Sequence, residues 1–376
     1  MKSRWPVRIL CALLVLWYMR FGFASRRPTS KPRRILVAHN LLLGDTIMVA
    51  PLLKKLRARF PGAEIVMTCK PAFVAIFASR PYGVETVAFD PRDVRSFFAL
   101  FCRRGFDMAY LATDNRFSWL ARALDSRWVV AFDGDRPAYK NWLIDEFRKF
   151  PDHAMALGDL IAGHLLDGPS PDPYEVSDWP APPAAPFPKP DRPYVVLHVG
   201  ASTRLKYWSP ENWQGLIAYV EALGMRPVIT AGPGEEALIA EIDHERRFVS
   251  YRGNLSLPQM WRLLADARLV VCPDTGVGHL ARLAGVPVVI LFGPGSAVLS
   301  GGGEFWRNMV DRKVTIEGFP CRDENVLFRR YVPWAAQCGR TTAQCSSPKC
   351  MHALTAEMAI SAVDSLLARA AFKPGK

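Results

Sequence analysis

The sequence has few cysteines, and they follow no metal-binding pattern. Eight cysteines in 376 residues are too few for a disulfide scaffold of this size. Four of them fall within 30 residues of one another, at Cys321, Cys338, Cys345 and Cys350. No Cys-x2-Cys pair is present there, so structural thiols or an occasional disulfide are favoured over a four-thiolate zinc site. We therefore expect no bound metal ion.

The sequence also lacks a repeat and a strong compositional bias. Its 31 prolines and 26 glycines have no fixed period, which excludes collagen-like and short-repeat architectures. With 50% apolar and 22% charged residues, the composition is that of a globular protein rather than a disordered chain or a coiled coil. A chain of this length corresponds to roughly two or three domains.

Acidic residues are absent from the first 34 residues, which carry nine lysines and arginines. These nine account for most of the formal net charge of +13 and leave +4 for the rest of the chain. A nucleic-acid-binding protein more often spreads its basic groups over a folded face. We therefore expect no nucleic-acid partner.

The same segment contains one apolar run, residues 9–19, between Arg8 and Arg20. It is shorter than the ~20 residues that cross a bilayer, unless the flanking arginines snorkel. No clear cleavage site of a secretory signal follows it. We favour a membrane-surface helix or marginal anchor, held by apolar burial and by attraction to anionic lipid, over a true span, a signal or a frayed start. Residues 1–33 are thus expected to associate with a membrane.

From residue 34 onward, strand-like apolar runs alternate with amphipathic helical stretches. Strands are expected at residues 34–39, 64–69, 85–89, 107–111 and 128–132, with helices between them, notably at 94–103 and 117–124. Such a βαβ series predicts a mostly parallel sheet with helices on both faces. Residues 34–168 are therefore expected to form one α/β domain.

A proline-rich stretch separates this domain from a second βαβ series. Residues 169–193 hold ten prolines, which excludes a regular element and predicts a stiff linker. Beyond it, strands are expected at 194–199, 227–231, 269–272 and 286–292, and helices from 210, from 235, over 257–266, from 275 and over 354–370. We predict a second α/β domain over residues 194–376 and a ligand cleft between the domains, outside the carboxyl ends of the strands.

The sharpest candidate site lies where the strand at 269–272 meets the following helix. Asp274, Thr275 and Gly276 stand at this junction, and His279 follows in the helix. Small residues let backbone N–H groups approach a ligand, and a helix N-terminus carries about half a positive charge. The junction therefore suits an anion such as a phosphate. The alternative is that Asp274 or Thr275 merely caps the helix.

Two further strand ends strengthen this site. Ser202, Thr203 and Lys206 follow the strand at 194–199, and hydroxyls beside a lysine again suit a phosphate. Glu235 follows the strand at 227–231, where a carboxylate could accept hydrogen bonds from ribose hydroxyls. Each loop alone could be merely polar. Three such loops at neighbouring strand ends of one sheet are expected to converge on one pocket.

In the first domain, the loop at residues 40–45 ends in Gly44-Asp45. A partly desolvated Asp45 that faces the cleft could act as a general base on an acceptor hydroxyl. The alternative is that Asp45 caps a helix that begins at Thr46.

Together these residues resemble a known family. The motifs are Leu43-Gly44-Asp45, Lys206-x-Trp208, Gly232 to Glu235, Asp274-Thr275-Gly276-x-x-His279-Leu280-Ala281 and Phe292-Gly293-Pro294. In order and approximate spacing they are similar to those of glycosyltransferase family 9, the ADP-heptose:lipopolysaccharide heptosyltransferases. The resemblance covers roughly residues 34–370.

The resemblance implies a GT-B fold, in which two Rossmann-like doubly wound domains face a cleft. It implies transfer of a heptose or related sugar from ADP-heptose, bound in the second domain, to a lipopolysaccharide core acceptor, bound in the first. The anomeric centre would be inverted without a metal ion or other cofactor. Such an enzyme would be cytoplasmic and peripheral to the inner face of the inner membrane.

Carried over by position, the resemblance also implies roles for single residues. Asp45 would be the base, and Lys206 would stabilise the departing diphosphate, an effect worth a few kcal/mol per donor. The diphosphate would be surrounded by Ser202, Thr203, Lys206, Thr275, Gly276 and His279. The nucleoside would be held by Glu235, and Asp274 would also belong to the donor-binding residues. His39 and Val199 stand where the family usually has an arginine and commonly a proline, so the sugar and the acceptor stay open.

Three other functions fit the same residues. A GT-B enzyme could use another nucleotide sugar, because a fold does not fix its substrate. A sugar-nucleotide epimerase or hydrolase would consume the donor without an acceptor. A non-catalytic nucleotide-sugar-binding protein is the third, and the presence of Asp45 and Lys206 counts against it.

Overall fold

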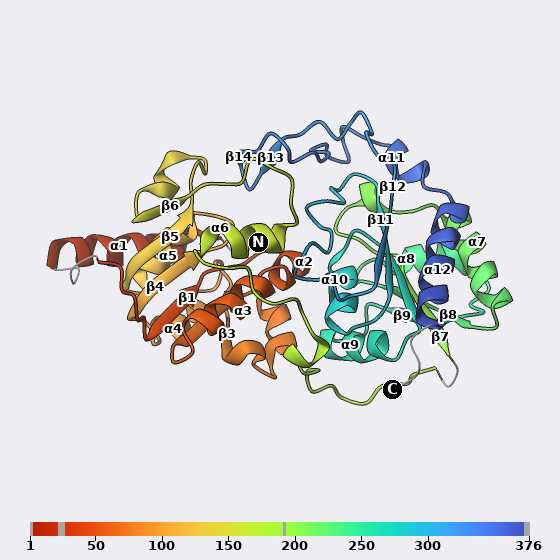
Figure 1. Ribbon diagram of the computed structural model, residues 1–376, viewed down its shortest axis with the longest axis horizontal. Helices are drawn as coiled ribbons and strands as arrows, with labels where there is room; N and C mark the ends of the chain where they lie inside the picture. Colours follow the sequence, from red (N-terminus) through yellow and green to blue (C-terminus); the bar gives the residue numbers. More distant parts are fainter. Residues whose placement is uncertain (1–2, 22–26, 191–192, 372–376) are drawn as a thin grey trace. The chain divides into compact units, whose positions relative to one another are not determined.

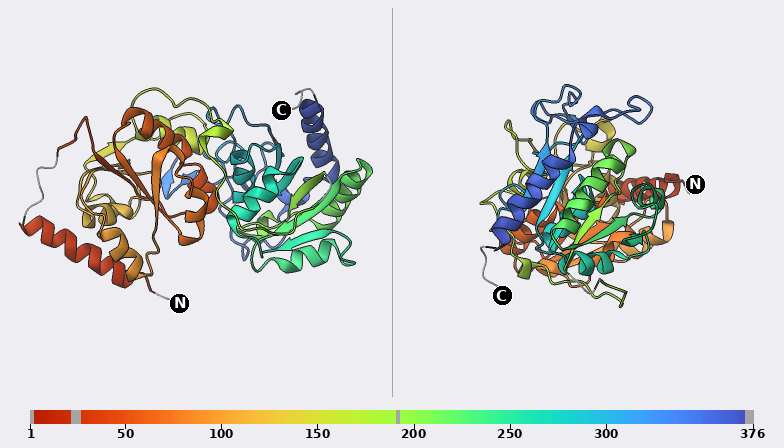
Figure 2. Two further views of the ribbon diagram at one scale, coloured as in Figure 1. Left: turned by 90° about the horizontal axis from the view of Figure 1, so that it is seen from below. Right: turned by 90° about the vertical axis from the view of Figure 1, so that its right-hand side faces the viewer.

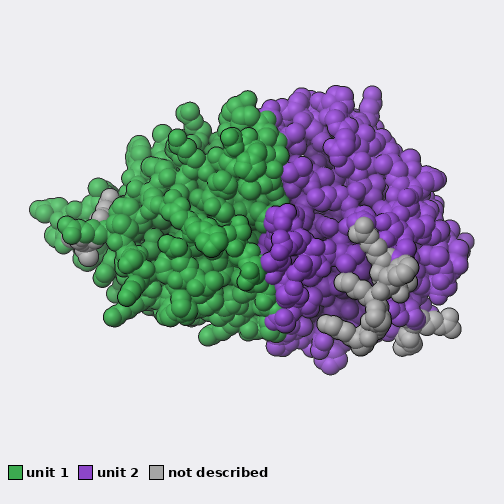
Figure 3. All heavy atoms as spheres, viewed as in Figure 1, with its two compact units in different colours: residues 1–172, 178–180, 326–334 green, residues 173–177, 181–325, 335–376 purple. Residues whose placement is uncertain are grey.

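The computed structural model describes residues 3–21, 27–190 and 193–371. The chain forms two compact units, coloured separately in Figure 3. Unit 1 consists of Met1–Asp172, Asp178–Pro180 and Val326–Trp334, and unit 2 of Pro173–Ser177, Ala181–Asn325 and Ala335–Lys376. Each unit is built on its own parallel sheet, as Figures 1 and 2 show.

The sheet of unit 1 has six parallel strands in the order β3-β2-β1-β4-β5-β6. The strands are β1 Arg34–Val37, β2 Glu64–Cys69, β3 Val84–Ala88, β4 Phe106–Leu111, β5 Ser126–Phe132 and β6 Glu146–Arg148. The α-helices are α1 Trp5–Phe21, α2 Leu43–Ile47, α3 Ala50–Arg59, α4 Val94–Phe101, α5 Phe117–Ala123 and α6 Leu157–Leu165. Three short 3-10 helices are η1 Pro71–Phe77, η2 Pro81–Gly83 and η3 Ala138–Asn141.

The sheet of unit 2 has six parallel strands in the order β12-β11-β10-β7-β8-β9. The strands are β7 Tyr194–His198, β8 Arg226–Ala231, β9 Val249–Arg252, β10 Leu269–Pro273, β11 Val288–Phe292 and β12 Asp311–Thr315. The helices are η5 Arg204–Lys206, α7 Pro210–Ala222, α8 Glu236–Ile242, α9 Leu257–Ala265, α10 Gly276–Leu283, α11 Lys349–His352 and α12 Ala356–Ala371.

Both sheets have the same doubly wound strand order, in which the chain starts at the middle of the sheet and fills one side before the other. This confirms the predicted α/β class. The order reverses between β1 and β4 in unit 1 and between β7 and β10 in unit 2. Loops that leave two such neighbouring strands diverge, and ligands of doubly wound sheets bind in the resulting crevice.

The central strands are apolar because helices cover both faces of each sheet. β7, β10 and β11 are buried along their entire length. In unit 2 the apolar side of α12 joins this core through Ala359, Val363 and Leu366. The carboxyl edges of the sheets are thereby held rigidly, and the loops that follow the strands are carried on this scaffold.

The predicted apolar stretch at residues 9–19 lies inside α1. One side of α1 packs on unit 1, where Val7 and Cys11 share a core cluster with Phe97 of α4 and Leu120 of α5. Within the described ranges, no helix combines the length and the apolar character that a membrane span needs.

The proline-rich stretch is anchored in pieces rather than free. The Trp179 indole donates a hydrogen bond to the carbonyl of Ile76 at 3.1 Å and packs on the ring of Phe77, within unit 1. Tyr174 is buried in unit 2, where its hydroxyl donates to the carbonyl of Leu283 at 2.7 Å. The short 3-10 helix η4, Val176–Asp178, lies between these two anchors.

One segment, Val326–Trp334, follows most of unit 2 in the sequence but packs in unit 1. It forms the hairpin of β13 (Val326–Leu327) and β14 (Arg330–Tyr331). The buried Arg330 guanidinium donates hydrogen bonds to the carbonyls of Thr113, Asp133, Phe132 and Phe328 at 2.7–3.1 Å and to Oδ1 of Asn115 at 2.7 Å. The two domains predicted from the sequence, 34–168 and 194–376, did not include this return of the chain to unit 1. Their boundaries remain a prediction.

Candidate functional site

In unit 2, the loops after β7, β8 and β10 meet at the carboxyl edge of the sheet. β7 and β10 are neighbours at the switch point, and β8 lies on the other side of β7. A pocket of about 330 Å³ lies at this edge. It is lined by Ser202 from the first loop, Glu235 from the second and Thr275 from the third. The structure thus brings together one predicted residue from each strand end.

Glu235 ties two of these loops together. Its Oε1 accepts hydrogen bonds from the N–H of Ala201 at 2.9 Å and the hydroxyl of Tyr207 at 3.1 Å, and its Oε2 accepts one from the N–H of Gly232 at 2.8 Å. A carboxylate offers about four acceptor positions. The carboxylate therefore holds the pocket wall and retains capacity for one further hydrogen bond.

Two glycines leave the space that the Glu235 carboxylate occupies. A Cβ atom on Gly200 would lie 1.9 Å from Oε2 of Glu235, and one on Gly232 would lie 2.7 Å from the same atom. Contacts this short require the carboxylate to move. Gly200 is therefore a steric requirement of the pocket.

Lys206 lies at the N-terminus of α10. Its ammonium donates to Oδ2 of Asp274 at 2.7 Å and to the carbonyl of Asp274 at 2.9 Å. An ammonium has three N–H donors, and the third has no partner among the described residues. The first backbone N–H groups of a helix also lack partners within the helix. A lysine and a helix N-terminus thus stand side by side, which suits an anion.

The two predicted threonines differ in their contacts. The hydroxyl of Thr275, the residue before α10, makes no capping hydrogen bond, and Thr275 lines the pocket. Thr203 caps η5 by accepting a hydrogen bond from the N–H of Leu205 at 3.4 Å. Gly276 is the first residue of α10. The alternative that Thr275 merely caps the helix is therefore wrong, whereas Thr203, for which no capping role was predicted, caps η5.

His279 is buried inside unit 2, with 4% of its surface exposed. Its Nδ1 lies 3.3 Å from Nη1 of Arg282, whose guanidinium pairs with Asp311 at 2.6 Å. Burial, together with the charges of Arg282 and Lys206, holds the pKa of His279 well below its usual range. His279 is therefore neutral and supports the first turns of α10, next to the Lys206–Asp274 pair.

Asp45 lies in unit 1, in the helix α2 that follows β1. It is the third residue of α2, which begins at Leu43, so the helix expected from Thr46 starts earlier. Its Oδ2 accepts a hydrogen bond from the N–H of Leu42 at 3.2 Å. A carboxylate in the first turn also interacts favourably with the helix dipole. The half-buried Asp45 thus helps to fix the start of α2, at the switch point of unit 1.

A charge network after β4 was missed at the sequence level. Lys140 pairs with Asp114 at 3.1 Å and with Asp135 at 2.9 Å, and Asp114 also pairs with Arg116. Burial alone would raise the pKa of Asp114, but the hydrogen bonds from Arg116 and the charges of Arg116 and Lys140 lower it to about 2. The sequence could have indicated this network, because the polar residues 113–116 follow the strand β4 at the switch point of unit 1.

An apolar wall of the unit 2 pocket was also missed. Tyr251, Leu257 and Met260 line it. Tyr251 comes from β9, whose sequence VSYR carries no clear strand pattern. Apolar and aromatic walls with a few polar groups are typical of small-molecule sites and can receive the flat ring of a base.

Within the described residues, no group of three or more His, Cys, Asp or Glu side chains is arranged to hold a metal ion. Cys321, Cys338, Cys345 and Cys350 are free thiols. Burial, and then the neighbouring thiols, raise the pKa of Cys350 to about 11. Cys350 is therefore a neutral thiol at physiological pH.

Comparison with known proteins places the chain in a family. Residues 94–316 match the model of glycosyltransferase family 9 (heptosyltransferase). Lipopolysaccharide heptosyltransferase 1 of Pseudomonas aeruginosa is 26% identical over 79% of this chain and 88% of its own length. The protein of the same name from Salmonella typhimurium is 34% identical over 111 residues. This match covers 29% of this chain and 35% of the Salmonella protein.

Solved structures show the same fold. The glycosyl transferase family 9 protein from Veillonella parvula superposes with a TM-score of 0.67 at 15% identity, over 92% of this chain and 100% of its own. E. coli ADP-heptose lps heptosyltransferase II gives a TM-score of 0.66 at 17% identity, over 90% and 99%. Identities this low show the fold alone, which is the GT-B fold expected from the sequence. Because the family model matches more than half of the chain, this protein belongs to glycosyltransferase family 9 and is a glycosyltransferase.

Proposed function

We propose that this glycosyltransferase transfers a heptose, or a closely related sugar, from ADP-heptose to a lipopolysaccharide core acceptor. The names of its relatives, lipopolysaccharide heptosyltransferases 1 and 3, support this substrate class. The observation that carries the proposal is the meeting of Ser202, Glu235 and Thr275 at one pocket of unit 2. The Lys206–Asp274 pair lies at the adjoining helix start.

The donor would occupy this pocket from one end to the other. Its base would lie on the apolar wall that contains Tyr251 and Met260, and a ribose hydroxyl would donate to the remaining acceptor position of Glu235. The diphosphate would then reach Thr275 and the start of α10. This arrangement is supported by the apolar residues, the Glu235 carboxylate and Thr275, which all line the pocket.

The chemistry proposed is a single displacement. An acceptor hydroxyl oxygen bonds to the anomeric carbon while the bond from that carbon to the diphosphate oxygen breaks, which inverts the centre. Negative charge grows on the leaving diphosphate. Lys206 and the N–H groups at the start of α10 are already in place to stabilise it, and Asp274 fixes the position of the ammonium. These groups supply the positive charge that the proposed metal-independent reaction needs.

Asp45 is proposed as the base that receives the proton of the acceptor hydroxyl. Its hydrogen bond from Leu42 fixes the orientation of the carboxylate at the carboxyl edge of the unit 1 sheet. This edge is also where the fold places ligands. A general base must lie within hydrogen-bond reach of the proton that it removes.

The acceptor is lipid-linked in this proposal, so the enzyme works at the cytoplasmic face of the inner membrane. The basic first segment and the apolar helix α1 support a peripheral contact with that surface. Attraction to anionic lipid is worth about 1 kcal/mol per basic residue near the surface.

The proposal is tested by mass analysis of the product made from ADP-heptose and truncated lipopolysaccharide acceptors. Asp45→Asn should lose transfer by ~100-fold or more while donor affinity, measured by calorimetry, stays within about twofold. Asp172→Asn, which removes an exposed carboxylate of unit 1, is the matched control and should retain full activity. An equal loss of donor affinity and transfer in Asp45→Asn would contradict the base role. Donor turnover without any acceptor would favour a hydrolase or epimerase instead.

A further inference from the structure

The helix α1 is apolar on its outer side as well as on the side that packs on unit 1. The inner side buries Val7, Cys11 and Val15. On the outer side, Trp5, Leu13 and Phe21 are 66%, 58% and 70% exposed. A helix that is apolar all round is normally either fully buried or in contact with lipid. The described part of unit 1 covers the inner side only, so the outer side requires another environment.

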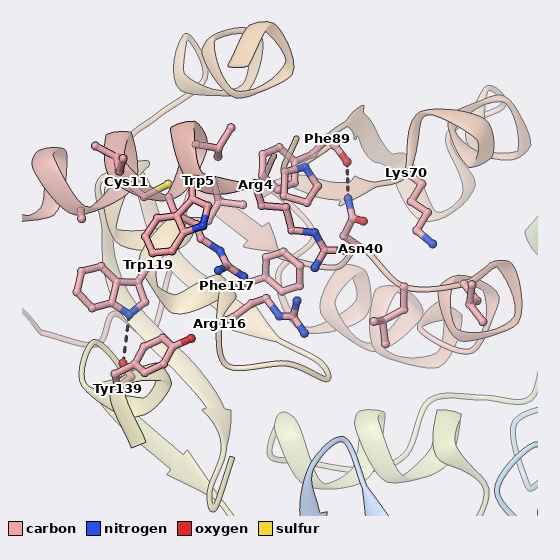
Figure 4. A pocket seen from close by; sticks show the side chains of 18 residues that line it. Arg4, Trp5, Cys11, Asn40, Lys70, Phe89, Arg116, Phe117, Trp119 and Tyr139 are labelled. Atoms are coloured by element: carbon pink, nitrogen blue, oxygen red, sulfur yellow. Dashed lines mark hydrogen bonds between the residues drawn. The ribbon is translucent and has the colours of Figure 1, made fainter. Parts of the chain in front are cut away.

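A pocket of about 570 Å³ lies between α1 and the carboxyl edge of the unit 1 sheet, as Figure 4 shows. Its walls are mainly apolar and include Trp5, Phe89, Phe117 and Trp119. We call it the α1 pocket. Its volume falls within the range of small-molecule sites, about 300–1,000 Å³. The apolar outer side of α1 continues directly from its rim, because Trp5 belongs to both.

Basic side chains gather in the α1 pocket. Arg4 and Arg8 come from the beginning of the chain, Lys70 follows β2 and Arg116 follows β4. Figure 4 shows Arg4 and Arg116 extending into the same space beside Phe117. Arg116 is paired with Asp114, whereas Arg4, Arg8 and Lys70 form no ion pair with a described carboxylate.

The electrostatics of this cluster indicate an excess of positive charge. Burial, and then the charges of Arg92, Arg116 and Arg8, lower the pKa of Arg4, and the nearby Asp90 compensates only in part. Like charges held together in a partly apolar site repel one another unless an anion joins them. Phosphate oxygens accept charge-assisted hydrogen bonds from several guanidinium groups at once.

We propose that the α1 pocket binds one phosphate-bearing lipid of the membrane. An alkyl chain lies along the apolar wall between α1 and Phe117, and the phosphate contacts Arg4 and Arg8. The proposal extends the membrane-contact part of the proposed function, and it does not depend on which sugar is transferred. The loop residues Leu41 and Leu42 form part of the same pocket, and the N–H of Leu42 holds Asp45. A lipid bound there would therefore lie against the start of the helix that carries the proposed base.

The test uses the full-length protein and monomeric dodecyl phosphate, with binding measured by calorimetry. Arg8→Glu should weaken binding at least tenfold, because it replaces a cation of the pocket with a carboxylate. Arg20→Glu is the matched control, since Arg20 is also exposed on α1 but does not line the pocket. It should change the affinity less than twofold. Equal weakening by both variants would mean that a diffuse surface charge binds the probe, and would overturn the proposal.

A second pair of measurements tests the alkyl chain. Ala12→Trp fills the pocket from α1 and should reduce binding of dodecyl phosphate at least tenfold. Dodecyl maltoside, with the same chain and no charge, and inorganic phosphate, with no chain, should each bind the native protein at least tenfold more weakly. Equally tight binding of either control compound contradicts a combined chain-and-phosphate site.

Vesicles separate the pocket from general membrane association. The native protein should sediment with vesicles of phosphatidylglycerol, and Arg8→Glu should reduce the bound fraction more than Arg20→Glu does. Sedimentation with these vesicles in the absence of dodecyl phosphate binding would overturn the α1 pocket as a lipid site, and would leave the membrane contact under the proposed function intact.

Discussion

At the scale of single residues, the buried histidines His39, His198 and His279 all have lowered pKa values. Burial, and then the charge of Lys70, lower the pKa of His39 to about 3. Burial lowers the pKa of His198 to about 4. The hydroxyl of Thr46 donates to the carbonyl of Leu42, so the Nε2 atom of His39 must carry the proton in its 3.1 Å contact with that hydroxyl. His39 therefore places an uncharged ring just after β1.

These histidines predict how stability depends on pH. A histidine whose folded pKa lies below its unfolded value of about 6.5 contributes its full stability above pH 6.5 and loses it as the pH falls. Each one adds a slope of about 1.4 kcal/mol per pH unit below that value. Urea unfolding between pH 7.5 and 4.5 should show this loss of stability. His198→Asn should reduce the slope by about 1.4 kcal/mol per pH unit, because the variant takes up one proton fewer on unfolding. An unchanged slope in His198→Asn, with the exposed His244→Asn as the control, would contradict the neutral buried state.

Lys206 predicts a selective effect on catalysis. Lys206→Met should lower kcat by ~100-fold with a smaller change in KM, because the ammonium acts on charge that develops at the leaving diphosphate. Lys189→Met removes an exposed lysine of the same unit, which pairs with Asp266, and should leave both constants unchanged. Steady-state kinetics with saturating acceptor measures the difference. A rise in KM alone would restrict Lys206 to donor binding.

At the scale of elements, the loops after β7 and β8 form one structure through Glu235. Gly200→Ala would force the Glu235 carboxylate out of its contacts with Ala201 and Gly232. We expect binding of ADP, measured by calorimetry, to weaken at least tenfold, with a loss of stability of about 1–3 kcal/mol from the unpaired N–H groups. Gly163→Ala in α6, where a Cβ meets nothing within 4 Å, should change neither quantity adversely. Unchanged ADP binding by Gly200→Ala would show that the position of Glu235 does not matter for donor binding.

The central strands and the edge strand β3 could be predicted from the sequence, whereas the edge strands β6, β9 and β12 could not. β2, β4 and β10 are buried along most of their length and therefore appear as mainly apolar runs. β6 and β12 pair with one neighbour each and leave several side chains partly exposed, so EFR and DRKVT carry charges that hide the strand pattern. Their positions depend on the sheet that precedes them rather than on their own residues.

The site shows the same division. The doubly wound rule brings strand ends together, and it was enough to predict that Ser202, Glu235 and Thr275 meet. It could not indicate that Thr203 caps η5 or that His279 contacts Arg282, because these contacts depend on side-chain directions within a turn. The roles of all these residues in donor binding stay predictions.

At the scale of the whole molecule, Arg330 fixes the return of the chain to unit 1. Its guanidinium has partners for all of its donors, and removing it would leave several buried acceptors without hydrogen bonds. Arg330→Met should therefore lower the free energy of unfolding by about 3–5 kcal/mol. The neighbouring Arg329→Met alters an exposed arginine and should stay within about 0.5 kcal/mol. Urea denaturation followed by circular dichroism compares the two, and a similar small effect of both would show that Arg330 contributes no more than a surface residue.

This return also bears on how the protein can be divided. A fragment that stops before residue 190 would contain every strand of the first sheet. The carbonyls of Thr113, Phe132 and Asp133 would nevertheless lose their hydrogen bonds from Arg330. Cutting the gene in the proline-rich region would therefore yield one fragment that lacks residues 326–334. The other fragment would carry these residues without the carbonyl groups that Arg330 binds. A short synthetic peptide spanning residues 326–334 would be the natural complement of the first half.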